Sequence, residues 1–376
     1  MRILVLNFEY PPVGGGGGRV SAFLARALQQ RGHQLLILTT GIRGTRRREI
    51  DDGVEIVRVR TGRRSASQAS FLSMMSYVAA ASVRGTLLVR TWKPDVLHAH
   101  FAVPTGAAAW LVSRLTGVRY VLTVHLGDVP GGVPEKTSSY FRWVGRLTPP
   151  IWSRAAAVVA VSEYTRELAR RRYDVPIRVV PNGAPLAGRP RQAAPVGSPP
   201  VIAFVGRFQP QKDPLLAVEA LAKIADVPWH AVLVGDGPLR AAVEQRLREA
   251  GLSGRVRLTG WLAPEAADRE LAKADLLLMP SNAEGLPVVG VQALVHGVAI
   301  VGSRVGGLSE LIVDGVNGFG LTPGDRDGFA TALRRCLQDR NLLAGLKTAS
   351  HAMASAFDVA QVAESYEAIL AGAVGK

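Results

Sequence analysis

Residues 281–294 read SNAEGLPVVGVQAL and follow a short apolar run at residues 275–279 that Pro280 stops. The apolar run predicts a buried strand, and the segment after it predicts a helix. Pro287 suits the first position of that helix, and Gly297 suits its end. A strand, a loop and a helix in this order form one unit of an α/β fold.

Two polar side chains interrupt this apolar segment. Glu284 is expected on the loop at the carboxyl end of the strand, beside a helix N-terminus whose free N–H groups suit an anion. Gln292 follows two turns into the helix. Because doubly wound sheets bind ligands at the carboxyl ends of their strands, the segment indicates one end of an active site.

The same alternation of strands and helices extends along the chain and divides it into two halves. The first half, residues 1–183, holds predicted strands at residues 2–6, 34–39, 54–59, 96–99, 120–124, 157–161 and 177–180. The second half, residues 201–358, holds predicted strands at residues 201–205, 231–234, 256–258, 276–279 and 298–301. Residues 184–200 are rich in Pro, Ala, Gly and Arg without periodicity and predict a linker. We therefore expect two doubly wound, Rossmann-like α/β domains that face a central cleft.

The excess positive charge of the chain is confined to its first part and the linker. The net charge is +15 for 376 residues. Residues 1–180 carry 26 Lys and Arg against 11 Asp and Glu, a balance of +15; residues 181–199 add +2, and residues 200–376 carry 17 against 19, a balance of −2. This asymmetry suggests an anionic partner such as lipid headgroups, a lipid phosphate or nucleic acid. The alternative is that these arginines only keep the surface soluble.

A predicted helix at residues 66–90 combines apolar side chains, among them Phe71, Leu72 and Met75, with basic residues at both ends. Such a helix can lie on an anionic membrane, although a core helix of the first domain would look similar. No signal-peptide cleavage site follows the N-terminal apolar run, and the single Cys336 excludes an internal disulfide. We therefore expect a cytoplasmic protein, with peripheral contact to the inner face of the membrane as a hypothesis.

Eight short motifs in a fixed order resemble those of the family 4 glycosyltransferases, retaining enzymes of the GT-B fold (glycosyltransferase group 1). They are PPVGGGGGR at residues 11–19, DVLHAH at 95–100, TVHLGD at 123–128, VPNG at 180–183, VGRFQPQKD at 205–213, VGDGPLR at 234–240, EGLP at 284–287 and GGLSE at 306–310. The resemblance covers nearly the whole chain. It implies that the last helix, residues 359–376, packs back on the first domain. It also implies transfer of a sugar from a UDP- or GDP-sugar to a hydroxyl of a glycan, a lipid-linked glycan or a small molecule.

The resemblance assigns roles on the donor side. Glu284 is expected near the donor sugar, with Gly285, Leu286 and Pro287 beside it at the helix N-terminus. The family has a glutamate at the position of Gln292, where it binds the ribose hydroxyls of the nucleotide. An amide can still bond a diol, with roughly half the strength per bond. The resemblance therefore predicts that Gln292→Glu is tolerated or tightens nucleotide binding.

Cations and glycines complete the predicted donor site. Arg207 and Lys212 follow the first strand of the second domain and can neutralise a diphosphate leaving group as charge develops on it. We therefore expect no metal, and no cofactor besides the nucleotide sugar as co-substrate. The glycine run at residues 14–18 fails the dinucleotide-binding spacing. It is predicted to be a mobile loop whose Gly16 and Gly17 bring N–H groups to the donor phosphates and the acceptor, or else a simple flexible turn.

Further polar residues are assigned by position. The resemblance places His125 against the transferred sugar near its anomeric centre, and Asp128 is a weaker candidate for an acceptor ligand or base. Glu310 follows a Gly-Gly turn and is expected as a second anchor for the ribose or the sugar. His98 and His100 are expected to point to opposite faces of their strand, so that they do not form a metal-ligand pair.

Two other functions stay open at this point. One is a sugar-nucleotide epimerase of the same two-domain shape, whose chemistry needs acid and base groups around the sugar. The other is a non-catalytic sugar-nucleotide-binding protein, for which Gln292 is the only hint. The motifs favour a transferase, and they do not indicate a nucleic-acid partner. The sequence shows no clear pair of carboxylates for a double displacement. The resemblance implies the family's retaining mechanism, in which the leaving phosphate helps to deprotonate the acceptor, and the sequence is compatible with it.

Overall fold

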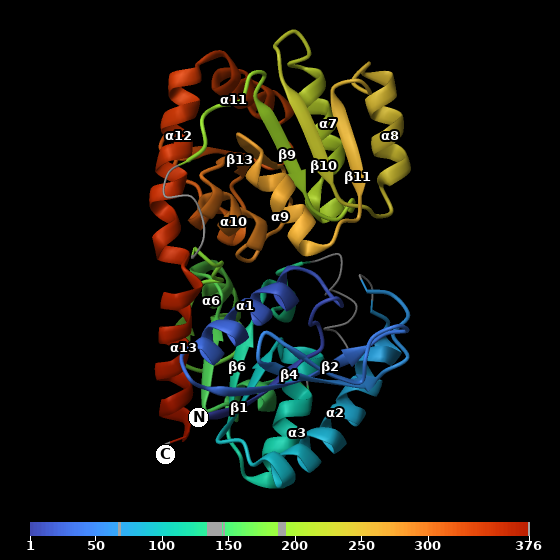
Figure 1. Cartoon of the computed structure of the whole chain (residues 1–376), viewed down its shortest axis with the longest axis vertical. Coiled ribbons are helices and arrows are strands. Elements are labelled where there is room, and N and C mark those ends of the chain that lie inside the picture. Colours follow the sequence, from blue (N-terminus) through green and yellow to red (C-terminus); the bar gives the residue numbers. More distant parts are fainter. Residues whose placement is uncertain (67–68, 134–144, 146, 187–192, 375–376) are drawn as a thin grey trace. The chain divides into compact units, whose positions relative to one another are not determined.

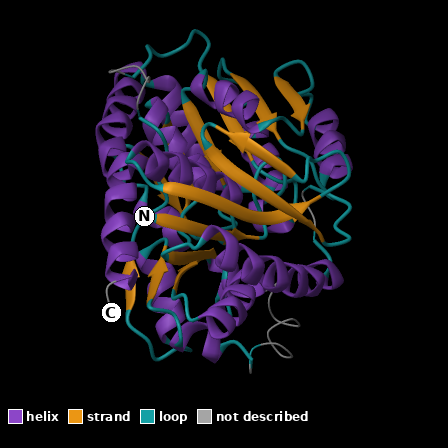
Figure 2. Cartoon of the chain, turned by 60° about the horizontal axis from the view of Figure 1, so that its bottom comes forward, coloured by secondary structure: helices purple, strands orange, loops and turns teal. Residues whose placement is uncertain are grey.

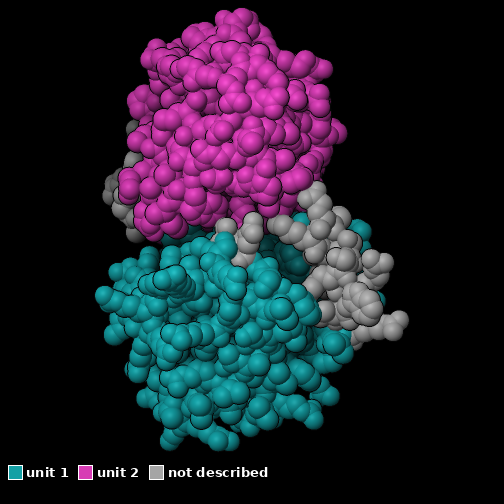
Figure 3. Space-filling model, turned by 90° about the vertical axis from the view of Figure 1, so that its right-hand side faces the viewer, with its two compact units in different colours: residues 1–183, 359–376 teal, residues 184–358 magenta. Residues whose placement is uncertain are grey.

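The structure is a computed structural model that describes residues 1–66, 69–133, 145, 147–186 and 193–374. The chain forms two compact units, one of residues 1–183 with 359–376 and one of residues 184–358 (Figure 3). Each unit is an α/β structure built on one sheet (Figure 1). The last helix, α13 (Val359–Val374), belongs to the first unit although the second unit precedes it in the sequence.

The sheet of the first unit has eight strands in the order β3-β4-β2-β1-β5-β6-β7-β8, and β3 with β4 is its antiparallel pair. The strands are β1 (Arg2–Asn7), β2 (Gln34–Gly41), β3 (Arg48–Asp51), β4 (Val54–Arg60), β5 (Val96–His100), β6 (Tyr120–Val124), β7 (Ala157–Ala160) and β8 (Ile177–Val179). The helices are α1 (Gly16–Gln30), α2 (Phe71–Trp92), η1 (Ala102–Gly106), α3 (Ala107–Thr116), η2 (Leu126–Asp128), α5 (Pro149–Ser153), α6 (Glu163–Arg170) and α13.

Both faces of this sheet are buried. Leu4 and Leu6 of β1 lie in a core with α2 and α3, whereas Ile3 and Val5 lie in a core with α1 and α13. The alternation follows from the two-residue period of a strand. The hydroxyl of Tyr366 on α13 also lies 3.0 Å from Oγ1 of Thr123 on β6, so α13 is joined to the sheet by a buried hydrogen bond as well as by apolar packing.

The sheet of the second unit is parallel and has six strands in the order β11-β10-β9-β12-β13-β14. The strands are β9 (Val201–Val205), β10 (His230–Val234), β11 (Val256–Gly260), β12 (Leu276–Met279), β13 (Ala299–Ser303) and β14 (Gly318–Leu321). The helices are η3 (Pro210–Lys212), α7 (Pro214–Ala222), α8 (Arg240–Glu249), α9 (Pro264–Ala272), α10 (Val288–His296), η4 (Gly306–Glu310), α11 (Arg326–Gln338), α12 (Arg340–Met353) and η5 (Ala354–Phe357). Figure 2 shows the helices and strands of both units in separate colours.

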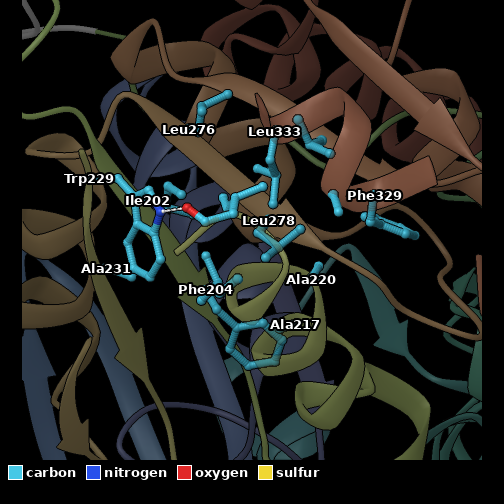
Figure 4. Close-up of a cluster of buried hydrophobic side chains, with 14 of the residues drawn as sticks. Ile202, Phe204, Ala217, Ala220, Trp229, Ala231, Leu276, Leu278, Phe329 and Leu333 are labelled. Atoms are coloured by element: carbon cyan, nitrogen blue, oxygen red, sulfur yellow. Dashed lines mark hydrogen bonds between the residues drawn. The ribbon is translucent and has the colours of Figure 1, made fainter. Parts of the chain in front are cut away.

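Large side chains fill one core of this second unit (Figure 4). Phe204 and Leu278 come from the central strands, and Phe329 comes from α11. Trp229 is almost fully buried, and its Nε1 donates to the carbonyl oxygen of Ile224 at 2.8 Å. The buried indole therefore keeps its polar atom satisfied.

An ion pair anchors the segment that enters the second unit. Asp275, just before β12, accepts from the backbone N of Val201 at 2.9 Å and from Nζ of Lys347 on α12 at 2.5 Å. Both side chains are almost fully buried. The end of the predicted linker is thus fixed to the sheet and to α12, whereas its residues 187–192 lie outside the described residues.

Helix α2 starts at Phe71, later than the predicted start at residue 66, and part of the difference, residues 67–68, lies outside the described residues. The reason is a capping box, in which Ser70 and Ser73 exchange side-chain-to-backbone hydrogen bonds. Of the helices the structure describes, α2 is the one long and apolar enough to cross a membrane by length and composition. In its most apolar stretch, 39% of the residues are buried in the unit.

Two other predictions about the first unit were wrong. Helix α1 begins at Gly16, so Gly16 and Gly17 form its first turn and are not part of a mobile loop. The side chains of His98 and His100 share one face of β5, with ring centroids 4.3 Å apart. Residues two apart on a strand point to the same side, which is why the opposite prediction failed.

Candidate active site

Two loops at the carboxyl edge of the second sheet hold each other. They are residues 206–213, after β9, and residues 280–287, after β12. Nε2 of Gln211 donates to the carbonyl oxygen of Ala283 at 2.9 Å, and the carbonyl oxygen of Gln211 accepts from the backbone N of Asn282 at 2.8 Å. Because β9 and β12 are neighbours in the sheet, segments that are distant in sequence meet at one edge.

Lys212 and Glu284 form an ion pair between these loops, with Nζ donating to Oε1. The Glu284 side chain is 5% exposed and the Lys212 side chain is 19% exposed. Burying a charge costs free energy that the partner must offset, so each side chain depends on the other. Because Lys212 keeps some contact with solvent, an incoming anion can compete with Glu284 for the ammonium group.

Arg207 lies in the same loop, directly after β9, and is half-buried. Its guanidinium forms no hydrogen bond or ion pair with another described residue. Close backbone packing fixes the loop around it. A Cβ on Gly235 would collide with the carbonyl oxygen of Gly206, and a Cβ on Gly237 would lie 2.5 Å from the carbonyl oxygen of Phe208. The loop backbone is thus closely packed, and it carries a cation without a partner among the described residues that suits a phosphate.

The loop after β12 leads into α10. Pro287 is the N-cap of this helix, with the extended backbone of φ −69° and ψ 124°, so the helix begins one residue later than predicted. Leu286 is buried, whereas Gly285 is only half-buried. The start of α10 therefore stands on an apolar support, with a small residue next to the Glu284 carboxylate.

A third loop joins this edge. The backbone N of Gly307 in η4 donates to the carbonyl oxygen of Glu284 at 3.1 Å. Glu310, at the end of η4, is exposed. The structure therefore places the Gly306–Glu310 turn next to the Glu284 loop, and the Glu310 carboxylate in contact with solvent.

Gln292 lies in α10 and is only 6% exposed. Its Nε2 donates to Oδ1 of Asp268 on the neighbouring α9. Nε2 of His296, one turn further along α10, lies 3.1 Å from the same oxygen. Gln292 is thus part of a buried polar cluster with Asp268 and His296.

The glycine run of the first unit packs tightly. The backbone N of Gly15 donates to Oε2 of Glu9 at 3.1 Å, so a carboxylate of the chain itself lies at the start of α1. A Cβ on Gly17 would lie 2.5 Å from Cζ of Phe101, and a Cβ on Gly18 would lie 2.6 Å from the carbonyl oxygen of Glu9. The glycines therefore allow close approach of this helix end to its neighbours.

Phe101 joins this helix end to His125. Phe101 follows β5 with a positive φ of 74°, which is unusual for a residue other than glycine. Its ring stacks on the His125 imidazole with centroids 4.4 Å apart. Nε2 of His125 is buried and bonds no other described residue. Burial lowers the pKa of His125 to about 4, so the imidazole is neutral at pH 7.

Asp128 supports the His125 loop. One of its carboxylate oxygens accepts from the backbone N of His125 and the other from the backbone N of Ala102, both at 2.8 Å. Burial raises the pKa of Asp128 to about 7, against the effect of these hydrogen bonds. Because both oxygens are used by the backbone, the geometry favours a positioning role over the predicted role as acceptor ligand or base.

Burial also lowers the pKa of His98 to about 3 and that of His100 well below its usual value. Oγ1 of Thr123 lies 2.9 Å from Nε2 of His98 and also contacts the Tyr366 hydroxyl of α13, so these groups belong to the packing of the sheet. Over the described part of the chain, no group of three or more His, Cys, Asp or Glu side chains is arranged to hold a metal ion.

Sequence reasoning missed three residues that shape these sites. Gln211 lies inside the quoted VGRFQPQKD motif, so its position gave a usable signal. Phe101 directly follows the DVLHAH motif, but its positive φ has no sequence signature in a phenylalanine. Asp268 is one of three acidic residues in α9, and only the fold shows that it is the one that faces Gln292.

Comparison with known proteins identifies the class to which this fold and these loops belong. A family model described as "Glycosyl transferase 4-like domain" matches residues 15–183, and one described as "Glycosyl transferases group 1" matches residues 199–339. Together with the relative described below, these matches show that the chain belongs to the group 1 glycosyltransferases and is an enzyme.

Individual relatives agree. The chain is 30% identical over 367 residues to a 2-deoxystreptamine glucosyltransferase of Streptomyces kanamyceticus, covering 89% of this chain and 93% of that one. Among solved structures it resembles a sucrose-phosphate synthase of Thermosynechococcus elongatus, with a TM-score of 0.82, 21% identity and 98% of each chain covered. It also resembles HepE of Anabaena in complex with UDP-glucose, with a TM-score of 0.75, 22% identity and 99% of each chain covered. These structures confirm the predicted GT-B fold.

Proposed function

We propose that this glycosyltransferase moves a sugar from a UDP- or GDP-sugar to a hydroxyl of a glycan, a lipid-linked glycan or a small-molecule acceptor, with retention at the anomeric carbon and without a metal. The observation that carries the proposal is the Lys212–Glu284 ion pair at the carboxyl edge of the second sheet, in the same loop region as Arg207, which pairs with no described residue. The solved complex of the similar HepE with UDP-glucose supports the same class of donor.

The exchange of partners at this edge explains how the site responds to its substrate. A bound diphosphate competes for the Lys212 ammonium and pairs with Arg207, so the two cations neutralise it. The Glu284 carboxylate is then released to accept hydrogen bonds from sugar hydroxyls. We assign Gln292 to the nucleotide ribose, Gly285, Leu286 and Pro287 to the helix N-terminus beside the sugar, and, more peripherally, Gly16, Gly17, His125 and Glu310 to the surroundings of donor and acceptor.

The reaction itself needs no covalent enzyme intermediate. The bond from the anomeric carbon to the diphosphate oxygen breaks, and the diphosphate leaves with the electron pair. The acceptor oxygen forms the new bond on the same face of the sugar, and its proton passes to an oxygen of the leaving phosphate. Arg207 and Lys212 stabilise the charge that develops on the leaving group, which is the role a metal ion plays at other sites.

A donor panel tests this proposal. The enzyme is incubated with UDP-, GDP- and ADP-sugars, with and without acceptors, in the presence of EDTA. Acceptor-dependent nucleotide release, with a product whose anomeric configuration by NMR equals that of the donor, is expected. An inverted product would contradict the retaining mechanism. A requirement for added divalent metal would contradict metal independence. A new sugar nucleotide without an acceptor would favour an epimerase, and binding without turnover would favour a non-catalytic role.

We also propose a cytoplasmic enzyme that touches the inner face of the membrane through α2. Four exposed apolar side chains follow one another at helical spacing along α2: Leu72 is 79% exposed, Met75 48%, Val83 66% and Leu87 46%. The exposed Arg84 and Arg90 lie among and beyond them. An apolar stripe with basic neighbours complements an anionic lipid surface.

Flotation with liposomes tests this contact. Binding to vesicles of phosphatidylcholine with phosphatidylglycerol is expected, and binding to pure phosphatidylcholine vesicles should be weaker. Replacing Leu72, Met75, Val83 and Leu87 with Ser should abolish flotation. Leu115→Ser removes a 65% exposed leucine from α3 and serves as the control. Absence of binding at low salt, or flotation that survives the quadruple change, would contradict the proposal.

A further inference from the structure

The cluster of Gln292, Asp268 and His296 fixes the orientation of an amide. The Asp268 carboxylate is 7% exposed, and its Oδ1 faces both Nε2 of Gln292 and Nε2 of His296. A carboxylate oxygen can only accept hydrogen bonds, so both nitrogens must donate to it. The contact therefore sets the side-chain amide of Gln292 with its NH₂ group toward α9.

The other end of the amide remains available. No described residue bonds Oε1 of Gln292, and this atom is not among the buried side-chain atoms that lack a partner. It therefore keeps contact with solvent. Helix α10 thus presents a carbonyl oxygen, an acceptor only, on its second turn after the N-terminus that follows the Glu284 loop.

We infer that Asp268 is a positioning residue for nucleotide recognition, which holds Gln292 so that its Oε1 accepts a hydrogen bond from a ribose hydroxyl of the donor. The inference rests on the proposed function, in which Gln292 faces the nucleotide. An amide without this contact could turn and present its NH₂ group, which a hydroxyl donor cannot use in the same way. The contact with Asp268 thereby determines that Gln292 presents its acceptor Oε1 and not its NH₂ group.

The cluster also revises the prediction that Gln292→Glu is tolerated or tightens binding. A glutamate at this position would bring a second carboxylate against that of Asp268 in a buried place, where two like charges oppose each other. We expect Gln292→Glu to weaken nucleotide binding when Asp268 is present. Changing Asp268→Asn in the same protein supplies a donor to the new carboxylate and should restore binding. We therefore expect the double variant to bind the nucleotide, and Gln292→Glu alone to bind it weakly.

The test measures how strongly the intact enzyme distinguishes a ribose from a dideoxyribose. Titration calorimetry compares UDP and GDP, each with its 2′,3′-dideoxy form, and inorganic pyrophosphate reports the phosphate part of the site. Wild type should prefer the ribose form about tenfold, the effect of roughly one hydrogen bond of this kind. Asp268→Ala and Gln292→Glu should reduce that preference toward unity, and Gln292→Glu with Asp268→Asn should regain it.

The outcomes distinguish a failure of the proposed donor class from a failure of the positioning role of Asp268. Pyrophosphate affinity should stay unchanged in all variants that carry the expected effect, which shows that the site is still folded. If wild type binds neither UDP nor GDP, the proposed donor class is wrong and the inference falls with it. If wild type prefers the ribose form and Asp268→Ala keeps that preference, or the double change fails to restore it, the inference alone is overturned.

Discussion

The two units have the same doubly wound plan but opposite chemistry at the carboxyl edges of their sheets. The edge of the second unit carries charge, with Lys212 paired to Glu284 and Arg207 unpaired among the described residues. The edge of the first unit carries neutral rings, with His125 stacked on Phe101. The difference teaches that one architecture can present a charged edge on one sheet and an edge of neutral rings on the other, because the residues that follow the strands differ.

The two units also differ in how well they can bind an anion, as the comparison of the two edges leads one to expect. In the second unit, the cations of the β9 loop can exchange a protein carboxylate for a phosphate. In the first unit, Glu9 lies at the N-terminus of α1 and accepts from the backbone N of Gly15. A helix start that a neighbouring carboxylate already satisfies attracts a second anion weakly. The comparison therefore predicts that changes at the second edge affect phosphate-dependent steps most, and changes at the first edge affect stability and acceptor use.

The largest effect is expected from Glu284→Ala. The change removes the carboxylate nearest the proposed donor sugar, and transfer should fall by about a hundredfold to a thousandfold, as for the loss of one preorganised group in other active sites. Lys212 is partly exposed and can reach solvent, so the protein should stay folded. The measurement is the initial rate with the donor found in the panel, together with circular dichroism.

Glu244→Ala is the matched control for this change. Glu244 pairs with Arg240 on α8, in the same unit, through exposed side chains. Its loss should leave transfer unchanged. A fully active Glu284→Ala variant would contradict the assigned site and remove the basis of the comparison between the two edges.

Lys212→Ala should have the next largest effect. It leaves the buried Glu284 carboxylate without its ion-pair partner, which should lower the free energy of unfolding by about 3 kcal/mol. It also removes one of the two cations for the diphosphate, so that pyrophosphate affinity should fall about tenfold. Urea unfolding and calorimetry measure the two effects.

The control for Lys212 is Lys223→Ala, which breaks the exposed pair with Asp327. Exposed pairs contribute little, so neither stability nor pyrophosphate binding should change appreciably. If Lys212→Ala bound pyrophosphate as tightly as wild type, Lys212 would be a structural partner of Glu284 and not a phosphate ligand.

The sequence predicts a feature of these edges well when the feature depends only on neighbouring residues. Asp213 is the N-cap of α7 and accepts from the backbone N of Leu216. An Asp followed by a Pro indicates this cap from neighbouring residues alone. The Lys212–Glu284 pair joins residues 72 apart, and neither residue's neighbours specify the contact. The two positions were predicted to share a site, but their pairing follows only from β9 lying beside β12.

At the edge of the first unit, too, the sequence could not predict a contact between residues that are distant in the chain. The glycine run at residues 14–18 was predicted to be a mobile loop, but this interpretation ignored the residues that surround it. Gly17 needs to be glycine because the Phe101 ring lies where a Cβ would be, and the two residues come from different parts of the chain. The run of glycines is therefore visible in the sequence, whereas the long-range contact that requires it is visible only in the structure.

Gly17→Ala tests that packing and should have a moderate effect. The new Cβ would lie 2.5 Å from Cζ of Phe101, whose ring must move and is stacked on His125. Overpacking of this kind should lower the free energy of unfolding by about 2 kcal/mol and reduce transfer several-fold. Gly127→Ala is the control, because a Cβ there meets no atom within 4 Å. Equal stability of the two variants would show that the Gly17 contact relaxes at no cost.

The smallest effect is expected from the titration of His125. Its pKa is about 4 in the folded protein against an ordinary 6.5, because burial opposes the charged ring. Between these values the unfolded chain binds a proton that the folded chain does not bind. The stability that the neutral ring contributes is therefore complete above pH 6.5 and is lost as pH falls toward 4, by about 1.4 kcal/mol per pH unit.

Comparing wild type with His125→Asn isolates this group, because the other buried groups of the edge are common to both proteins. Asp128 in particular acts in the opposite direction, since its raised pKa of about 7 means that the stability it contributes is lost as pH rises. Urea unfolding at pH 7.5, 6.5 and 5.5 should show wild type losing about 1 kcal/mol more than the variant between the last two values. His230→Asn, at an exposed position at the start of β10, reports the effect of removing a histidine as such. Parallel pH profiles for wild type and His125→Asn would mean that the first edge admits a charged imidazole, and the contrast between a neutral edge and a charged edge would fail.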